Sequence, residues 1–252
     1  MVSRKWPRFL PGQNIFEKEN AVKLISDIRI YQSDVENTDG NPLPGPTGNR
    51  ALNLAAQRIA MKLREAGFSL GEFTHLYLNF TTCLPEGTIR PAKRTADRYH
   101  PWYRYYDVGV CRQAFDRLNR TDASATEVTE MVFDRIRQAL VTYFAPDGQS
   151  VRVIESAVEE ALSKGAEMRM RFKEKKAAKA TAVLYLTLRE DARYEPVVCV
   201  YDLQGRTLLE ETLAPTSDLS SIGEILLSSR KVTVKPRKSV YAQGLAPVSF
   251  SF

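Results

Sequence analysis

The feature that most constrains the fold is a change in hydrophobic period between residues 23 and 82. Leu52, Ala56, Ile59 and Leu63 recur at helical spacing, which predicts a helix over residues 49–66 that Gly67 ends. Residues 74–82 instead alternate apolar and polar side chains, which is typical of a strand. With a further strand expected over 23–32, this order of strand, loop, helix and strand indicates an α/β layer.

The second half of the chain predicts two helices followed by antiparallel strands. The helices are expected near 124–144 and 150–164, and Gln204-Gly205 predicts a hairpin turn. The strands are expected over residues 167–174, 181–189, 195–203 and 207–213. Beyond Lys235 we expect an extended tail that packs back through Phe250 and Phe252.

These elements predict an α/β or α+β protein, with an N-terminal mixed α/β layer followed by a helix and a small antiparallel sheet. We expect an α/β domain over residues 1–146, with long loops at 33–48 and 83–101. Residues 147–252 would form an α+β module with an extended tail. The loop at 33–48 is dense in proline and glycine, so it cannot be a helix or a central strand.

Composition excludes several classes of protein. Hydrophobic residues make up 43% and charged residues 26% of the chain, which is ordinary for a globular protein. No run of about 18 apolar residues occurs, and the basic N-terminus lacks the apolar stretch of a secretory signal. Cys83, Cys111 and Cys199 are too few and too widely spaced for a disulfide framework or a zinc site. We therefore expect reduced cysteines and a cytoplasmic location, with no membrane contact.

Positive charge is concentrated in three windows, although the net charge is only +6. Residues 90–104 carry five basic residues, 169–179 carry six, and 230–238 carry five. One interpretation is a polarised surface that attracts an anionic partner. The other is three separate strand edges, where lysine discourages aggregation.

Motifs that would indicate catalysis are absent. His75 and His100 belong to no metal-binding pattern, so we expect neither a metal nor a cofactor. A couple of Cys83 with either histidine stays open, because sequence does not show proximity. The segment before the helix at Asn49 and Arg50 lacks the spacing of a phosphate loop. That segment is therefore interpreted as a rigid loop capped by Thr47 or Asn49.

The most unusual segment is the aromatic run at residues 99–107. In a strand, Tyr103, Tyr105 and Asp107 would face one side, and Trp102, Arg104 and Tyr106 the other. Three interpretations are open: a wide core strand, a protein interface, or a platform that stacks on unpaired bases. The candidate partner-binding residues are Tyr99, Trp102, Tyr103, Arg104, Tyr105, Asp107, Asn49 and Arg50.

Two segments, His75-Leu-Tyr-Leu-Asn-Phe-Thr81 and Trp102-Tyr-Arg-Tyr-Tyr-Asp-Val-Gly109, resemble bacterial immunity proteins of polymorphic toxin systems. The resemblance covers residues 50–145. It implies a protein that neutralises a toxin by occluding the toxin's active site. It transfers no individual functional residue.

The leading hypothesis is a non-enzymatic protein that binds another protein, as an intracellular inhibitor or immunity protein that neutralises a toxin. The alternative is a nucleic-acid-binding protein that uses the basic windows and the tyrosines, with affinity that falls steeply as salt rises. The second alternative is an enzyme with an unfamiliar site near His75, Asn79 and His100. The oligomeric state stays open.

Overall fold

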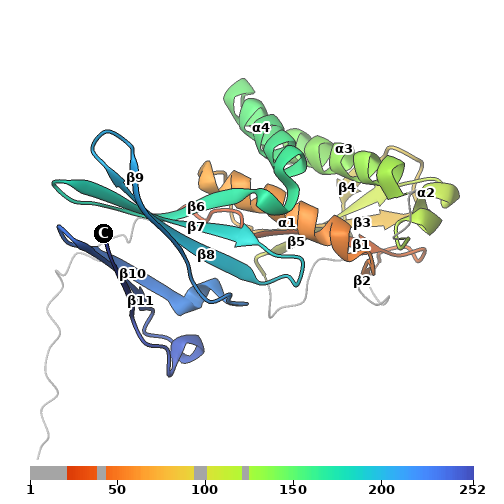
Figure 1. The fold of residues 1–252 in the computed structure, drawn as a ribbon. Coiled ribbons are helices and arrows are strands. Elements are labelled where there is room, and N and C mark those ends of the chain that lie inside the picture. Colours follow the sequence, from red (N-terminus) through yellow and green to blue (C-terminus); the bar gives the residue numbers. More distant parts are fainter. Residues whose placement is uncertain (1–21, 39–43, 94–100, 121–124) are drawn as a thin grey trace, which may run out of the picture.

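The computed structural model describes residues 22–38, 44–93, 101–120 and 125–252 (Figure 1). It confirms the expected fold class, with a mixed sheet and helices followed by antiparallel sheets. Within these residues, no helix has the length and apolar character needed to cross a membrane. The helices are α1 (Arg50–Glu65), α2 (Arg112–Arg117), α3 (Ala125–Phe144) and α4 (Gly148–Lys164). The strands are β1 (Asp27–Gln32), β2 (Gly45–Pro46), β3 (His75–Thr81), β4 (Ile89–Pro91), β5 (Tyr103–Gly109), β6 (Arg169–Lys176), β7 (Ala180–Leu188), β8 (Tyr194–Asp202), β9 (Thr207–Thr212), β10 (Ile222–Leu227), β11 (Lys231–Pro236) and β12 (Val248–Ser251).

The first sheet has five strands in the order β2-β1-β3-β5-β4. Its three central strands, β1, β3 and β5, are parallel, and the short edge strands are antiparallel to their neighbours. Helix α1 connects β1 to β3. It begins where the Asn49 side chain accepts a hydrogen bond from the Leu52 backbone N–H at 3.2 Å, and it is followed by Gly67 at φ +77°. Both ends agree with the sequence prediction.

One face of this sheet is apolar and lies under the helices. Ile28 and Ile30 of β1, Leu78 and Phe80 of β3, and Val108 of β5 are fully buried in the main hydrophobic core with residues of α1 and α3. Because neighbouring residues of a strand point to opposite faces, the residues between them lie on the other side of the sheet. That second face carries the polar and aromatic side chains.

The second half contains two antiparallel sheets. Strands β6-β7-β8-β9 form one sheet, and β10-β11-β12 form the other. In β7, Ala182, Leu184, Leu186 and Leu188 are fully buried, as their alternation predicts. Gly205 takes φ +80° in the turn between β8 and β9, which confirms the predicted hairpin.

The main hydrophobic core contains residues of both halves. Helix α1 contacts β1 on one side and α4 and β6 on the other. The division at residue 146 stays a prediction, because it concerns whether each half folds independently. The shared core shows that the halves pack closely.

The C-terminal region is more regular than the sequence indicates. The chain after Lys235 was expected to be extended, but it adds β12, which pairs with β11. Phe250 and Phe252 do pack against the core, as expected. Neither β10 nor β11 was predicted, and Ile222–Leu227 contains a bulge that interrupts its alternation.

A crossing of two segments depends on Gly109 at the end of β5. The chain between β3 and β4 passes over this residue, so that Gly109 N–H donates to Thr88 O at 2.8 Å and Gly109 O accepts from Gly87 N–H at 3.0 Å. A Cβ atom at position 109 would lie 2.0 Å from the backbone oxygen of Pro85. No side chain fits there unless the crossing segment moves.

We therefore expect Gly109→Ala to lower the free energy of unfolding by about 2 kcal/mol or more, through overpacking against the backbone. Gly148→Ala is the control, because a Cβ atom at the start of α4 would meet no atom within 4 Å. Urea unfolding measures the free energy of unfolding of both variants. Equal values for Gly109→Ala and Gly148→Ala would contradict the close approach of the Pro85 backbone to Gly109.

Candidate functional site

The face of the five-stranded sheet opposite the helices, called the polar face here, carries three rows of side chains. Each row crosses the strands, because its members are register partners. The rows consist of Tyr31, Asn79, Asp107 and Arg90; of Arg29, Tyr77 and Tyr105; and of Asp27, His75 and Tyr103.

Tyrosine rings fill the middle of the polar face. The ring centroids of Tyr31 and Tyr77 are 5.1 Å apart, and those of Tyr31 and Tyr105 are 5.3 Å apart. All three rings are buried. Burial raises the pKa of Tyr77 and of Tyr105, so both hydroxyls stay protonated at neutral pH. These rings form a second small core rather than a contact surface.

The row at the carboxyl end is polar and buried. The Asn79 amide nitrogen donates to Asp107 Oδ1 at 2.8 Å, and both residues are almost fully buried. Burial raises the pKa of Asp107, although the hydrogen bond from Asn79 and the charge of Arg90 oppose this shift. The ionised carboxylate is therefore costly to hold in the folded chain.

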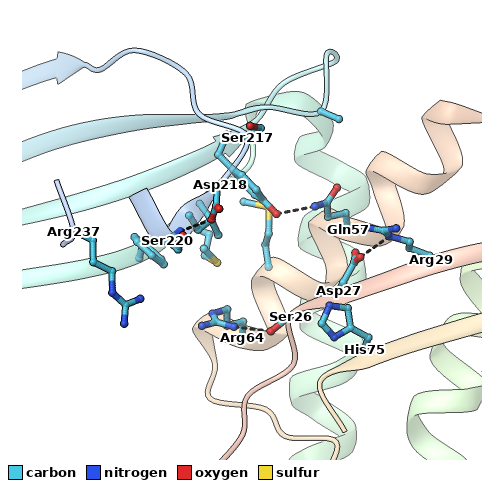
Figure 2. Close-up of a pocket in the computed structure, with 16 residues that line it drawn as sticks. Ser26, Asp27, Arg29, Gln57, Arg64, His75, Ser217, Asp218, Ser220 and Arg237 are labelled. Carbon is cyan, nitrogen blue, oxygen red and sulfur yellow. Dashed lines mark hydrogen bonds and ion pairs between the residues drawn. The ribbon is translucent and has the colours of Figure 1, made fainter. Parts of the chain in front are cut away.

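The row at the amino end opens into a cavity of about 550 Å³, called the junction groove here (Figure 2). Its walls come from both halves of the chain. Polar residues that line it are Ser26, Asp27, Arg29, Gln57, Arg64, His75, Tyr194, Ser217, Asp218, Ser220 and Arg237.

Hydrogen bonds and an ion pair order the walls of the junction groove. Arg29 Nε contacts Asp27 Oδ2 at 2.6 Å, and Arg64 donates to Ser26 Oγ at 3.0 Å (Figure 2). Gln57 donates to the Tyr194 hydroxyl at 2.7 Å, which links α1 to β8. Burial raises the pKa of Asp27, against the attraction of Arg29. The groove can thus offer hydrogen-bond donors and positive charge to a ligand.

An aromatic rim borders the junction groove, formed by His75, Tyr103 and Trp102. The ring centroids of His75 and Tyr103 are 4.5 Å apart, and those of Tyr103 and Trp102 are 5.9 Å apart. The Trp102 backbone oxygen accepts a hydrogen bond from His75 N–H at 3.3 Å, which holds the two residues together. Trp102 is 39% exposed, so its ring is accessible.

The structure separates the predicted site residues into two groups. Trp102 is exposed, Tyr103 and Arg104 are half-buried, and Tyr105 and Asp107 are buried. Within β5 the alternation agrees with the sequence prediction, since Tyr106 packs in the core with its ring centroid 4.6 Å from that of Tyr143. Trp102 precedes β5, and its ring packs edge-on against Tyr103 instead of following this alternation. The accessible residues, Trp102, Tyr103 and Arg104, can contact another macromolecule directly, whereas the buried Tyr105 and Asp107 cannot.

Several predictions fall outside what the structure can place. Tyr99 and His100 lie outside the described residues, as does part of the loop at 33–48.

Asn49 and Arg50 do not join the aromatic rim. They lie at the start of α1, beyond the carboxyl end of β1, whereas the groove lies at the amino end. Asn49 is buried, and its side chain caps α1 and donates to Arg120 O at 2.9 Å. Asn49 therefore has a structural contact, and Arg50 is exposed at the far end of the sheet.

The structure excludes a catalytic pair of Cys83 and His75, because the two residues lie at opposite ends of β3. His75 is the first residue of β3 and Cys83 follows its last residue, so the strand separates them by roughly 20 Å or more. Among the described residues, no group of three or more His, Cys, Asp or Glu side chains could hold a metal ion.

Sequence reasoning missed the basic and polar walls of the groove. Arg29, Arg64, Tyr194 and Arg237 come from distant segments, and no local pattern distinguishes them from surface residues. Among the residues that line the groove, the sequence pointed to His75 and placed Arg237 in the basic window 230–238.

Comparison with known proteins gave no match to this chain, neither among protein-family models, nor among curated proteins, nor among solved structures.

The buried charge of Asp107 leads to a pH-dependent prediction. Asp107→Asn keeps an oxygen that accepts from Asn79 and removes the carboxylate. Because the folded-state pKa is raised, the stability contributed by Asp107 is lost as pH rises above its ordinary value of 3.8. We expect Asp107→Asn to be more stable than the natural chain at pH 7, by a margin that shrinks as pH falls toward 3.8.

Urea unfolding at several pH values measures this margin. A margin that is negative at pH 7, or that grows as the solution is acidified, would contradict a costly buried carboxylate.

Proposed function

We propose that this protein binds another protein through the aromatic rim and the junction groove, without catalysing a reaction. The observation that carries the proposal is the position of Trp102. Trp102 is 39% exposed, and its backbone oxygen accepts from the N–H of His75, which lines the junction groove.

The aromatic rim has the composition of an interface hot spot. Trp, Tyr and Arg are the residues that contribute most to binding energy at interfaces. Arg104 follows Tyr103 in β5 but lies on the opposite face of the sheet, where its guanidinium is 5.7 Å from the ring centroid of Phe73. Tyr105 and Tyr106 support the same strand from within, so the rim presents a rigid surface.

The junction groove supplies specificity beside the rim. It is polar and large enough for one or two side chains of a partner, and Arg29 exposes half of its side chain there. Burying such a charge in an interface costs desolvation free energy. A partner with an acidic group opposite Arg29 compensates this cost and is therefore favoured. The aromatic rim would thus anchor the partner through ring contacts, and Arg29 in the junction groove would add a charged contact beside it.

An inhibitor or immunity protein is the specific form of this proposal. The resemblance of residues 50–145 to immunity proteins of polymorphic toxin systems suggests a toxin as the partner. Such a partner would be neutralised by occlusion of its active site.

Nucleic acid is the alternative partner, and one observation favours it. The basic windows at 169–179 and 230–238 approach one another near the groove, where Arg237 and Lys173 line the same cavity. Binding to mixed DNA and RNA fragments that weakens steeply as salt rises would support this alternative over a protein partner.

Photo-crosslinking tests the proposed surface directly. A photo-reactive phenylalanine analogue in place of Trp102 should crosslink one defined protein in the native host. The same analogue in place of Leu208, which is 46% exposed on β9, is the control and should not. Equal yields of the same product from both positions would reject the rim as the contact surface.

The captured protein then allows a quantitative test. We expect Trp102→Ala to weaken its binding by about tenfold or more, as hot-spot truncations do, with little change in melting temperature. Tyr106→Ala, in the core, should instead destabilise the fold by roughly 3 kcal/mol. If Trp102→Ala destabilised the fold as much as Tyr106→Ala, Trp102 would be a core residue.

A further inference from the structure

A second cavity adjoins the junction groove on the side of the four-stranded sheet. Its volume is about 430 Å³, and Arg64 and Arg237 line both cavities. Arg171 and Lys173 of β6 complete its basic wall. Two of the basic windows thus meet here, because β6 contacts β10 and β10 pairs with β11.

Lys173 is held in this cavity by the backbone. Its Nζ donates to Ile222 O at 3.0 Å and also to Gly223 O. Burial lowers the pKa of Lys173, and the charge of Arg237 lowers it further, while Glu224 compensates only in part. Lys173 and Arg237 therefore place two positive charges on the wall of the same cavity.

Arg237 and Arg64 have no acidic partner either. Among the described residues, Arg237 makes no ion pair and no side-chain hydrogen bond, although its backbone N–H is fixed to Ser221 O at 2.9 Å. Arg64 donates to Ile25 O and Ser26 Oγ, which are both uncharged.

The carboxylates nearby have partners other than Arg64, Lys173 and Arg237. Glu65 pairs with Lys62 and accepts a hydrogen bond from Arg171 N–H at 3.1 Å. Asp218 accepts from Ser220 N–H at 2.7 Å, and Asp27 pairs with Arg29. Among the described residues, none of the three cations at the junction makes an ion pair with a carboxylate, and Figure 2 draws Arg64 and Arg237 with no carboxylate joined to them.

We propose that Arg64, Lys173 and Arg237 form a binding site for an oxyanion group, a carboxylate or a phosphate. Guanidinium groups bind both oxyanions through paired charge-assisted hydrogen bonds. An oxyanion would also relieve the repulsion between Lys173 and Arg237. The site goes beyond the proposed protein interface, because it requires no contact with the aromatic rim.

Titration of the full chain with two small probes tests the site. Inorganic phosphate and glutarate are added separately at constant ionic strength, and amide chemical shifts of residues 171–173 and 235–238 are followed. We expect saturable binding of at least one probe. Arg237→Gln should weaken it by about tenfold, which is the effect of removing one charge-assisted hydrogen bond.

Arg230→Gln is the matched control. It removes the same charge just before β11, at the opposite end of that strand, and it lines none of the cavities described above. We expect it to change affinity by less than about twofold, as distant exposed charges do. Acetylation of Lys173 by an amine-reactive reagent gives a second readout, since a bound anion should slow it.

The outcomes are distinct. Saturation by phosphate alone assigns the site to phosphoryl groups, and saturation by glutarate alone assigns it to acidic side chains. Binding of neither probe, or equal weakening by Arg237→Gln and Arg230→Gln, would overturn the site. Crosslinking at Trp102 is independent of these results, so a failure here leaves the proposed protein interface separately testable.

Discussion

The packing of α1 against strands of both large sheets brings the two halves of the chain together at the junction groove. Most of its apolar residues, among them Ile59 and Leu63, are fully buried, so the helix is covered on more than one side. Arg58 adds a polar connection, since its guanidinium donates to Leu188 O at 3.0 Å and to Glu190 at 2.9 Å. An arginine buried in this way holds the end of β7 against the helix.

The same helix carries two residues into the groove. Gln57 reaches Tyr194 of β8, and Arg64 reaches Ser26 just before β1. Because one helix contacts both sheets, the groove exists as a preformed cavity rather than as a gap between loosely joined parts. Preformed surfaces lose less entropy when they bind a partner, which suits the proposed interface.

Much of the fold could be predicted because its elements have regular patterns. The helical spacing of α1, the alternation of β7 and the turn at Gly205 each follow from local sequence. The short strands β2 and β4 and the bulged β10 have too few regular residues to be recognised. The alternation of β5 predicted its two faces, but it did not show that the Tyr105 face would be buried, since burial depends on neighbouring segments.

The candidate site was harder to predict than the fold. Asn49 has the residue type of both a helix cap and a ligand-binding residue, and the structure shows that it caps α1. Arg64 and Arg237 are separated by most of the chain, and only the packing of α1, β6 and β11 brings them to one cavity. Such tertiary contacts leave no trace in local spacing.

Native-state hydrogen exchange at increasing urea concentrations is the most direct measurement of the shared core. If α1 joins both sheets into one body, the slowest amides of β3 and β8 should converge on the same free energy of opening, equal to that of global unfolding. Exchange of β8 through a distinctly smaller opening, while β3 stays protected, would show two separable units and contradict a preformed junction groove.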